Sequence, residues 1–590
     1  YIVYSSQAKH QKGKIPFTCF TPEEDSMIKR VSSETARSTM SSAGVLKTFR
    51  LALSCTAEYT AYHGSAANAL IAMNETVTRV NGVFEKDLAV HLNLIANTNV
   101  LIYTNADTDP YSDAANMDSW NTELQVNLTN TIGEANYDIG HLFGATGGGG
   151  NAGCIGCVCV DNQKGSGITS PADGVPEGDS FDIDYVAHEM GHQLGGTHTF
   201  SESYEGTGTN VEPGSGSTIM GYAGITNYNV QSNSDDYFVY ASIAQIQSNL
   251  ANKACAVNTS LNNPVITINA GADYNVPKGT AFILKAVGSS SNPAGVTYNW
   301  EQNDSGTAAT TNASSVATAS KTVGPTFRSV APSTNPNRYM PSLDKVLAGT
   351  LSTQWESVST VARTLNFVLT GRDNVAGGGQ TKSDAMRVFV KTGAGPFAVT
   401  SQNAANVTWT QGSTQTITWN VAGTTANTIN TANVNILLST DGGQTFTTVL
   451  AANTANDGSE TITVPNVMAP FCRIMIEAVG NIYYAVNSTP FSIGYTITTN
   501  CETFTNNTPL AIPDGTGTTS IGFGPVAQNT ITVPSGTPGT ISDVNVTVNA
   551  THTYISDLLV GVAHPDQTEI YLWGLNCTNQ DGFNVTFNDG

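Results

Sequence analysis

One eleven-residue stretch constrains this chain more than any other: His188-Glu189-x-x-His192-x-x-Gly195-x-x-His198. Residues i and i+4 of a helix lie on one face, so His188 and His192 can present their imidazoles to a single metal ion. Glu189 projects beside that pair. Gly195 can adopt the positive φ that ends a helix and turns the chain back. We expect this turn to bring His198 to the same ion as a third ligand.

Three neutral histidines and one water describe an open, catalytic zinc site. A structural zinc site is the alternative, but such sites close with four protein ligands, often cysteines, and need no carboxylate beside the first histidine. Only nine of the 590 residues are histidines, so composition does not explain their spacing here. The sequence therefore predicts one catalytic Zn²⁺ on His188, His192 and His198, with Glu189 beside its water.

The length and texture of the chain predict several domains, because 590 residues are too many for one hydrophobic core. Residues 1–44 are polar and irregular, and we interpret them as an N-terminal extension or the remnant of a pro-segment. Strand and helix patterns alternate over 45–258, which predicts an α/β (α+β) domain with a twisted sheet and an active-site helix. The expected strands are 45–54, 88–95, 100–104 and 137–146, and the expected helices include 70–84, 121–135, 182–195 and 242–254. Asp182 or Asp184 is expected to cap the helix at 182–195.

Helical periodicity disappears after residue 263. Short alternating strands between clusters of Gly, Asn, Pro and Ser predict all-β sandwich modules. We expect three of them, at 263–393, 394–495 and 499–590, and we interpret the last as truncated. The sequence TGAGPF at 392–397 is typical of a linker.

Charge and hydropathy exclude some partners. The formal net charge is -22, with 46 acidic against 24 basic residues, which argues against nucleic acid and an anionic membrane surface. No run of about eighteen apolar residues exists, so no membrane-spanning helix is expected. The first residues lack the apolar core of a signal peptide, so we expect that a signal and further upstream sequence have been removed. This balance suits a secreted, extracellular protein.

The chain has nine cysteines. Cys154, Cys157 and Cys159 form a cluster that suggests either metal or disulfides. No second CxxC completes a four-ligand site, which favours disulfides of an exported protein. The odd total leaves at least one thiol without a partner in the chain, and the connectivity stays open.

The histidine motif resembles the extended zinc signature of the metzincin metalloproteases. Those enzymes carry a methionine turn beneath the metal, and Met220 in STIMGYAG is the matching residue. The stretches TFRLALSCTAEYTAYHG, FDIDYVAHEMGHQLG and STIMGYAGI together resemble the bacterial, secreted, reprolysin-like metallopeptidases. Tyr222 departs from that group, since Met-x-Tyr is similar to astacins and serralysins. There the tyrosine stabilises the oxyanion; the alternative is that Tyr222 only lines a wall.

This resemblance implies hydrolysis of peptide bonds without a covalent intermediate. Glu189 would take a proton from the metal-bound water and deliver it to the leaving amine. It also implies an edge strand that pairs with an extended peptide, because glycines let a second backbone approach closely. A flexible loop is the alternative for this segment. Its residues are Gly148, Gly149, Gly150, Asn151, Ala152 and Gly153.

Cys19 precedes the expected α/β domain. In some metzincins a pro-segment cysteine occupies the zinc and keeps the enzyme latent, so residues 1–44 are a candidate pro-segment partner in cis. The simpler interpretation of Cys19 is a disulfide or an unrelated thiol. The oxygen-rich loop at 105–113 offers an additional Ca²⁺ site, although it lacks the glycine and glutamate positions of an EF-hand.

The β modules have weaker resemblances. Residues 263–393 resemble a PKD/Ig-like module, 394–495 resemble an Ig/FnIII-like sandwich, and 499–590 resemble a P-domain through a stretch with Asp543, His552 and Asp557. No nucleophile or metal-ligand spacing accompanies His552, which favours a structural role.

The function predicted from the sequence is a secreted zinc endopeptidase that cleaves extracellular proteins. The alternative is a multi-module adhesin or surface-binding protein whose protease domain is latent. A zinc enzyme for another bond, such as an amidase, is a third hypothesis, which the glycine-rich strand disfavours.

Overall fold

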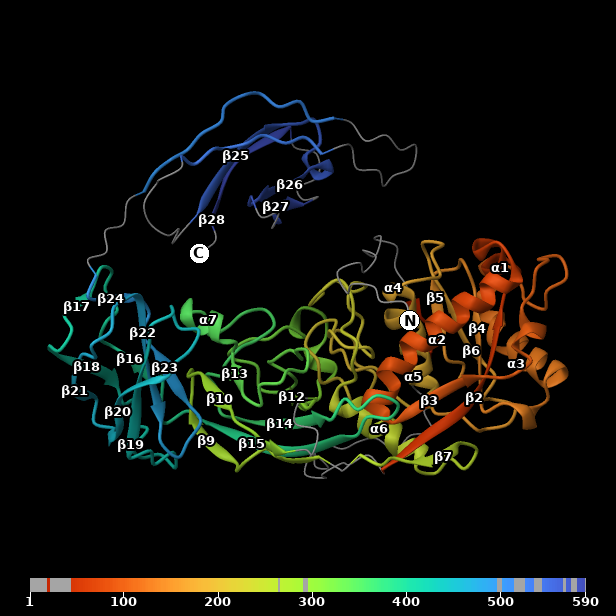
Figure 1. Cartoon of the computed structure of the whole chain (residues 1–590), viewed down its shortest axis with the longest axis horizontal. Coiled ribbons are helices and arrows are strands. Elements are labelled where there is room, and N and C mark those ends of the chain that lie inside the picture. Colours follow the sequence, from red (N-terminus) through yellow and green to blue (C-terminus); the bar gives the residue numbers. More distant parts are fainter. Residues whose placement is uncertain are drawn as a thin grey trace. The chain divides into compact units, whose positions relative to one another are not determined.

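The computed structural model describes residues 18–21, 44–263, 266–289, 295–495, 501–513, 526–534, 544–565, 569–574 and 581–588. The chain divides into two compact units, Tyr1–Ile497 and Thr498–Gly590. The first unit begins with mixed helices and strands and continues with β-sheet modules (Figure 1). This order confirms the predicted fold class.

A seven-stranded sheet organises the N-terminal part of the first unit. Its order is β1-β5-β6-β4-β2-β3, and β7 also pairs with β2. The strands β2, β3, β4 and β6 run parallel, whereas β5 is antiparallel to β6. The bounds are β1 Thr18–Cys19, β2 Val45–Cys55, β3 Val90–Leu94, β4 Ile139–Phe143, β5 Gly149–Asn151, β6 Gly167–Ser170 and β7 Val257–Ser260.

The prediction of a strand at 100–104 is wrong. Residues Thr98–Leu101 form a 3₁₀ turn instead, and only a single bridge joins Ile102 to Cys55. The Thr98 hydroxyl donates to the carbonyl of Ile95 at 2.7 Å, which stabilises the turn.

Helices cover both faces of the sheet. Alternate residues of β2, such as Phe49 and Leu51, share a core with α2, α5 and α6, whereas Ala52 joins the core of α3 on the other face. This alternation follows from the two-residue period of a strand. The bounds are α1 Ala57–His63, α2 Ala66–Leu88, α3 Trp120–Thr131, α4 Asp179–Phe181, α5 His188–Leu194 and α6 Tyr240–Leu250.

The helical stretch that carries the histidine motif begins earlier than expected. α4 starts at Asp179 after Gly178, whose φ is 76°, and a π-helical turn over Asp182–Ala187 continues directly into α5. The prediction that Asp182 or Asp184 is the N-cap is therefore wrong, because both lie inside the helical stretch. Turns of this kind are frequent at functional sites.

The next part of the first unit is built from β-sheets. A four-stranded sheet has the order β12-β14-β15-β9, and a six-stranded sheet further along contains β17-β24-β22-β19-β20 with β23. The first set is β8 Thr267–Asn269, β9 Tyr274–Pro277, β10 Phe282–Leu284, β11 Val287–Ser289, β12 Thr297–Gln302, β13 Arg338–Met340, α7 Leu343–Leu347, β14 Arg363–Arg372 and β15 Thr381–Lys391. The second set is β16 Ala398–Val399, β17 Thr408–Trp409, β18 Thr414–Asn420, β19 Asn433–Ser439, β20 Thr448–Ala455, β21 Ser459–Thr463, β22 Ala469–Ala478, β23 Tyr484–Val486 and β24 Phe491–Ile493.

These two sets of strands share one hydrophobic core. A single cluster of buried side chains extends from Ile268 to Ile493. Phe397, the last residue of the predicted linker, packs its ring against that of Tyr483 with centroids 5.1 Å apart. The second unit contributes two strand pairs, β25 Asn545–Thr551 with β28 Gly582–Asn588, and β26 Leu559–Ala563 with β27 Glu569–Gly574. Asp543 lies outside the described residues.

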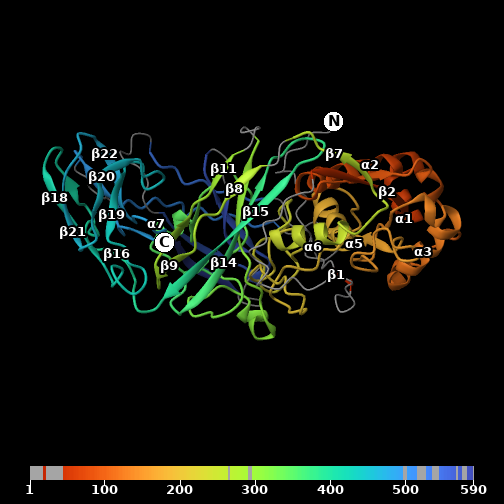
Figure 2. The same cartoon turned by 90° about the horizontal axis from the view of Figure 1, so that it is seen from below.

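A buried ion pair joins the first set of strands, β8 to β15, to the α/β part. Arg372, at the end of β14, donates from Nε to Asp87 Oδ1 at 2.8 Å, and both side chains are 0% exposed. Arg372 also donates to the carbonyl of Phe238 at 2.7 Å. Nearby, Tyr240 of α6 packs against Val368 of β14. Figure 2 shows α6 next to the sheet that contains β14 and β15.

Two disulfides lie in the α/β part. Cys154 is bonded to Cys157, and Cys159 is bonded to Cys255 after α6. The expectation that this cluster forms disulfides is confirmed. Within the part of the chain that the structure describes, no helix is long and apolar enough to cross a membrane.

Candidate active site

The three motif histidines converge beside α5: His188 is its first residue, His192 follows within the helix, and His198 lies after the turn at Gly195. Their Nε2 atoms are 3.2 Å apart for His188 and His192, 3.1 Å for His192 and His198, and 3.3 Å for His188 and His198. Zinc binds imidazole nitrogen at about 2.0–2.1 Å in tetrahedral geometry, which separates two such nitrogens by about 3.3 Å. The three nitrogens therefore have the spacing of a tetrahedral histidine site for zinc.

Gly195 produces the turn that brings in the third histidine. It follows α5 with a φ of 122°, a conformation that favours glycine. A Cβ at this position would also lie 2.9 Å from the Cβ of Asn249, so space is restricted as well. The chain then reverses, and His198 reaches the pair on the helix, as the motif predicts.

Each histidine is oriented through its other ring nitrogen. Nδ1 of His188 lies 2.6 Å from the carbonyl of Ile219, and Nδ1 of His192 lies 2.8 Å from the carbonyl of Gly196. Nδ1 of His198 lies 2.9 Å from Glu205 Oε1. Because these oxygens accept hydrogen bonds, each Nδ1 carries the proton and each Nε2 presents its lone pair to the shared centre.

The sequence predicted none of these three orienting partners, which are the carbonyls of Ile219 and Gly196 and the carboxylate of Glu205. The carbonyl of Ile219 has no signature in the sequence, although its neighbour Met220 was expected beneath the metal. Glu205 follows His198 by seven residues, and an acidic residue close behind the third histidine was the available signal. Carboxylates and carbonyls in this position fix the ring and raise its basicity as a ligand.

Met220 is fully buried. A Cβ at Gly191 of α5 would lie 2.7 Å from Met220 Sδ, so the helix and the methionine meet where Gly191 has no side chain. The carbonyl of Met220 accepts from Thr199 N at 3.0 Å, which ties the turn to the residue after His198. Met220 therefore lies against the helix that carries two of the histidines, and its role beneath the metal stays a prediction.

Glu189 is fully buried beside the histidines. The hydroxyl of Thr21 donates to its Oε2 at 3.1 Å. A Cβ at Gly150 of β5 would collide with the Glu189 carboxylate, which explains the glycine at that position. Burial raises the pKa of Glu189 to about 7. A carboxylate with a pKa near neutrality is suited to taking and returning a proton.

Tyr222 also lies at the site. Its ring stacks on Phe200 with centroids 4.2 Å apart and lies 4.7 Å from the ring of His198. The Tyr222 hydroxyl donates to the carbonyl of Cys19 at 3.5 Å. It is therefore close to the histidines, while its expected role towards an oxyanion stays a prediction.

The glycine-rich segment forms β5 and the turn after it. Among its residues, Gly149–Asn151 pair with β6 on one side, and Gly148 and Gly150 accept hydrogen bonds from the N-terminal segment on the other. The amide of Thr18 donates to Gly148 at 3.1 Å and that of Phe20 to Gly150 at 2.8 Å. Ala152 N donates to the Thr21 hydroxyl at 2.7 Å, and Gly153 has a φ of 71°. The outer edge of β5 is therefore already paired with residues 18–20.

Cys19 forms no disulfide, which contradicts the first of its two simpler interpretations and leaves the unrelated thiol as the other. Its Sγ lies 3.7 Å from His192 Nε2. Cys19 and the three histidines are the only group of three or more His, Cys, Asp or Glu residues, within the described parts of the chain, whose ligand atoms could hold a metal. A thiolate added to three imidazoles completes a four-ligand tetrahedral zinc site.

The loop at 105–113 has a local role. Asp109 accepts from Ala57 N at 2.9 Å and from Tyr111 N at 3.1 Å, and thereby caps the start of α1. The Ca²⁺ site suggested for this loop has no support in the described residues.

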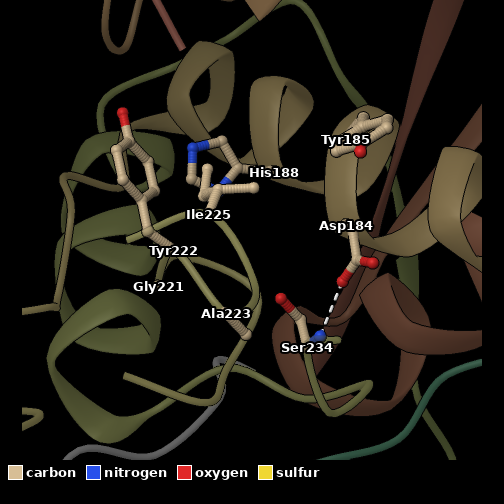
Figure 3. Close-up of a pocket in the computed structure, with 8 residues that line it drawn as sticks. All are labelled: Asp184, Tyr185, His188, Gly221, Tyr222, Ala223, Ile225 and Ser234. Carbon is tan, nitrogen blue, oxygen red and sulfur yellow. Dashed lines mark hydrogen bonds between the residues drawn. The ribbon is translucent and has the colours of Figure 1, made fainter. Parts of the chain in front are cut away.

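A cavity lies next to His188, between the helical stretch and the residues that follow Met220. Figure 3 shows Tyr222 and His188 on one side of it and Asp184 with Ser234 on the other. Asp184 Oδ1 accepts from the amide of Ser234 at 2.6 Å.

Comparison with known proteins adds a family for the α/β part. Residues 45–251 match the family model described as "Metallo-peptidase family M12B Reprolysin-like". No curated protein matches the chain. Among the solved structures, fibronectin(III)-like modules of Clostridium thermocellum CbhA are 12% identical, cover 39% of this chain and 92% of that chain, and have a TM-score of 0.14.

The N-terminal four Ig domains of Dscam1 isoform 8.4 are 11% identical, cover 38% of this chain and 44% of that chain, and have a TM-score of 0.12. These TM-scores do not define the fold of the β modules. The family match coincides with the segment that holds the three converging histidines. The chain therefore carries a reprolysin-like M12B metallopeptidase domain at residues 45–251.

Proposed function

We propose that this protein is a secreted zinc endopeptidase that cleaves extracellular proteins. The observation that carries the proposal is the convergence of three histidine Nε2 atoms within 3.1–3.3 Å of one another, beside the buried carboxylate of Glu189. The acidic net charge and the disulfides at Cys154–Cys157 and Cys159–Cys255 support an extracellular location.

In the proposed mechanism His188, His192 and His198 hold the metal through Nε2. A bound zinc ion supplies a Lewis acid that polarises the scissile carbonyl and acidifies water. Glu189 accepts the proton of the attacking water and returns it to the leaving amine. Tyr222 donates from its hydroxyl to the oxyanion of the tetrahedral intermediate. The backbone of Gly149–Asn151 aligns the substrate by adding it as a strand.

Residues 18–21 are proposed to keep this site latent. Thr18 and Cys19 pair with Gly149 and Gly150 where a substrate strand would bind, and Thr21 contacts Glu189. Cys19 would supply a fourth ligand, through Sγ, to a metal held by the three histidines. A peptide cannot occupy the edge of β5 until this segment is displaced. The P-domain-like segment at 499–590 is proposed as a stabilising or substrate-docking appendage.

Metal removal tests the proposed activity. We expect the full chain carrying Cys19→Ala to bind one zinc per chain, to cleave casein or gelatin, to lose this activity on chelation and to regain it with Zn²⁺. Metal content is measured by atomic spectroscopy and cleavage by the release of new amino termini. A zinc-loaded chain that cleaves no protein would contradict the proposal and favour an adhesin with a silent site.

The latency role of Cys19 has its own test. We expect the full chain with Cys19→Ala to cleave peptide at least roughly tenfold faster than the unchanged chain, which corresponds to about 1.4 kcal/mol of lost inhibitory binding. Initial rates on a fluorogenic peptide measure the difference. Cys501→Ala is the matched control, because that thiol is exposed and lies outside the metallopeptidase domain. Equal rates for the two variants would rule out the role.

A further inference from the structure

The helix α6 holds the turn that brings His198 to the other two histidines. The amide and the hydroxyl of Thr197, the residue before His198, both donate to Oε1 of Gln245 at 3.0 Å. Four residues further along α6, Nδ2 of Asn249 donates at 2.8 Å to the carbonyl of Leu194, the last residue of α5. Residues i and i+4 share one face of a helix, so a single face of α6 contacts both ends of the turn. The position of α6 therefore determines where His198 lies.

A second face of α6 lies against the first set of strands. Tyr240 and Ala244, which are also four residues apart, form a buried cluster with Val368 of β14. Nε2 of Gln247 donates to the hydroxyl of Thr381 on β15 at 3.4 Å. Figure 2 shows α6 between α5 and the sheet that contains β14 and β15. The helix therefore connects this sheet to the turn that carries the third histidine.

The N-terminus of α6 is capped by Glu301, which belongs to β12 and lies outside the matched residues 45–251. Val239, at the N-cap position, makes no side-chain hydrogen bond to the helix. Instead, Oε2 of Glu301 accepts from the amide of Tyr240 at 2.7 Å, and Oε1 accepts from the hydroxyl of Ser329 at 3.1 Å. A negative charge stabilises this end of a helix, because the first amides have no partner within the helix and carry partial positive charge. Glu301 therefore fixes the start of α6 from the neighbouring sheet.

Global stability does not explain the presence of Glu301. The residue is 4% exposed. Burial raises the pKa of Glu301 to about 7, although the charge of Arg372 acts in the opposite direction. A carboxylate whose pKa is raised on folding lowers stability at neutral pH, because the folded state disfavours its charged form. What Glu301 contributes in return is the contact with Tyr240.

We propose that Glu301 is a positioning residue for the metal site: it fixes α6, and α6 fixes the turn that carries His198. The metal site therefore depends on the first set of strands as well as on the metallopeptidase domain. This inference rests on the proposed zinc site and adds to it a residue that touches neither metal nor substrate.

Metal competition tests this role without any cleavage. The full chain carrying Cys19→Ala, in which the thiol is not a ligand, competes for Zn²⁺ with a chromophoric chelator. We expect Glu301→Ala to weaken zinc binding roughly tenfold, at the lower end of the effect of groups that orient metal ligands. Glu301→Gln should restore most of the affinity, because its amide oxygen still accepts from the amide of Tyr240. With Co²⁺ in place of zinc, the visible absorption spectrum, which depends on ligand geometry, should change in the alanine variant and return in the glutamine variant.

Glu356→Ala is the matched control. Glu356 is also a buried carboxylate of the same module, but it accepts from Arg338 Nη2 at 2.8 Å and from Ser342 N at 3.1 Å, and neither partner belongs to α6. Its removal leaves the cation of Arg338 without its buried partner, so the free energy of unfolding should fall while zinc affinity stays the same. A purely structural role of Glu301 predicts instead that zinc affinity follows stability in both variants. Chemical denaturation supplies the stability of each chain.

Glu301→Asp is the second variant, should the alanine chain not fold. It keeps the charge but shortens the side chain, which separates the carboxylate from the amide of Tyr240, so zinc binding should weaken in the same direction. Unchanged zinc affinity in the folded alanine or aspartate variant, or an equal loss in Glu356→Ala, overturns the positioning role and leaves the endopeptidase proposal intact. A chain that shows the expected zinc affinities but cleaves no protein contradicts the endopeptidase proposal and leaves the role of Glu301 intact.

Discussion

Glu189→Ala is expected to lower the rate of peptide hydrolysis by roughly 10²–10⁴-fold, the usual contribution of general acid–base catalysis. Zinc content should stay near one per chain, because the three Nε2 donors come from His188, His192 and His198. The variant also removes the carboxylate that Thr21 contacts. Loss of this contact could also change how residues 18–21 block the site. Rates are therefore compared between chains that also carry Cys19→Ala, so that a change in latency does not mask the effect on catalysis.

Glu189→Gln refines this experiment. Glutamine keeps the size of the side chain and can still accept from Thr21, but it cannot take a proton at neutral pH. We expect it to be nearly as inactive as the alanine variant. Glu134→Gln, remote from the histidines on the turn before β4, is the matched control and should retain full activity. A fully active Glu189→Gln chain would refute the proposed role of this carboxylate.

Arg372→Met is expected to lower the free energy of unfolding by about 3–5 kcal/mol, because it leaves the buried carboxylate of Asp87 without its cation. Both side chains are 0% exposed, so water cannot replace the lost partner. Chemical denaturation monitored by tryptophan fluorescence gives the change in midpoint. Phe238, whose carbonyl Arg372 also contacts, lies against Gly191 of α5, so a loss of zinc affinity is expected as well.

A second pair in the same module provides the control. Arg387 and Asp273 are 2.8 Å apart, but their side chains are 41% and 25% exposed. Arg387→Met should therefore cost less than about 1 kcal/mol. The double variant Asp87→Asn, Arg372→Met should recover part of the loss, since no buried charge remains. Equal effects of Arg372→Met and Arg387→Met would show that the Asp87 pair does not stabilise the fold.

The histidine site could be predicted because its information is local. His188, His192, Gly195 and His198 depend on the geometry of one helix and one turn, and those rules need no tertiary contacts. The alternation of strands after residue 263 likewise depends on neighbouring residues only. The predicted N-cap failed for a local reason too, because Gly178 offered an earlier start to the helix than the aspartates did.

Other parts of the site depend on contacts between distant residues. Cys19 contacts His192 although they are 173 residues apart in the sequence, and Arg372 contacts Asp87 although they are 285 residues apart. Such pairs leave no periodic pattern in the sequence. Taken alone, Cys19 resembles an ordinary thiol, and Arg372 and Asp87 resemble ordinary surface charges. Asp184 is the clearest case: its residue type suggested a helix cap, and only the folded chain places it at the cavity.

The ion pair between Arg372 and Asp87 also bears on how this architecture can be rearranged by recombination. Modules joined by exposed linkers can be exchanged freely between genes, since neither side depends on the other. Here the metallopeptidase domain contributes a buried anion and the adjoining module contributes its cation. A transferred module must carry an arginine at the position of Arg372. Otherwise the buried carboxylate of Asp87 in the recombinant chain has no cation beside it. The two segments are therefore expected to be inherited together, as one unit of exchange.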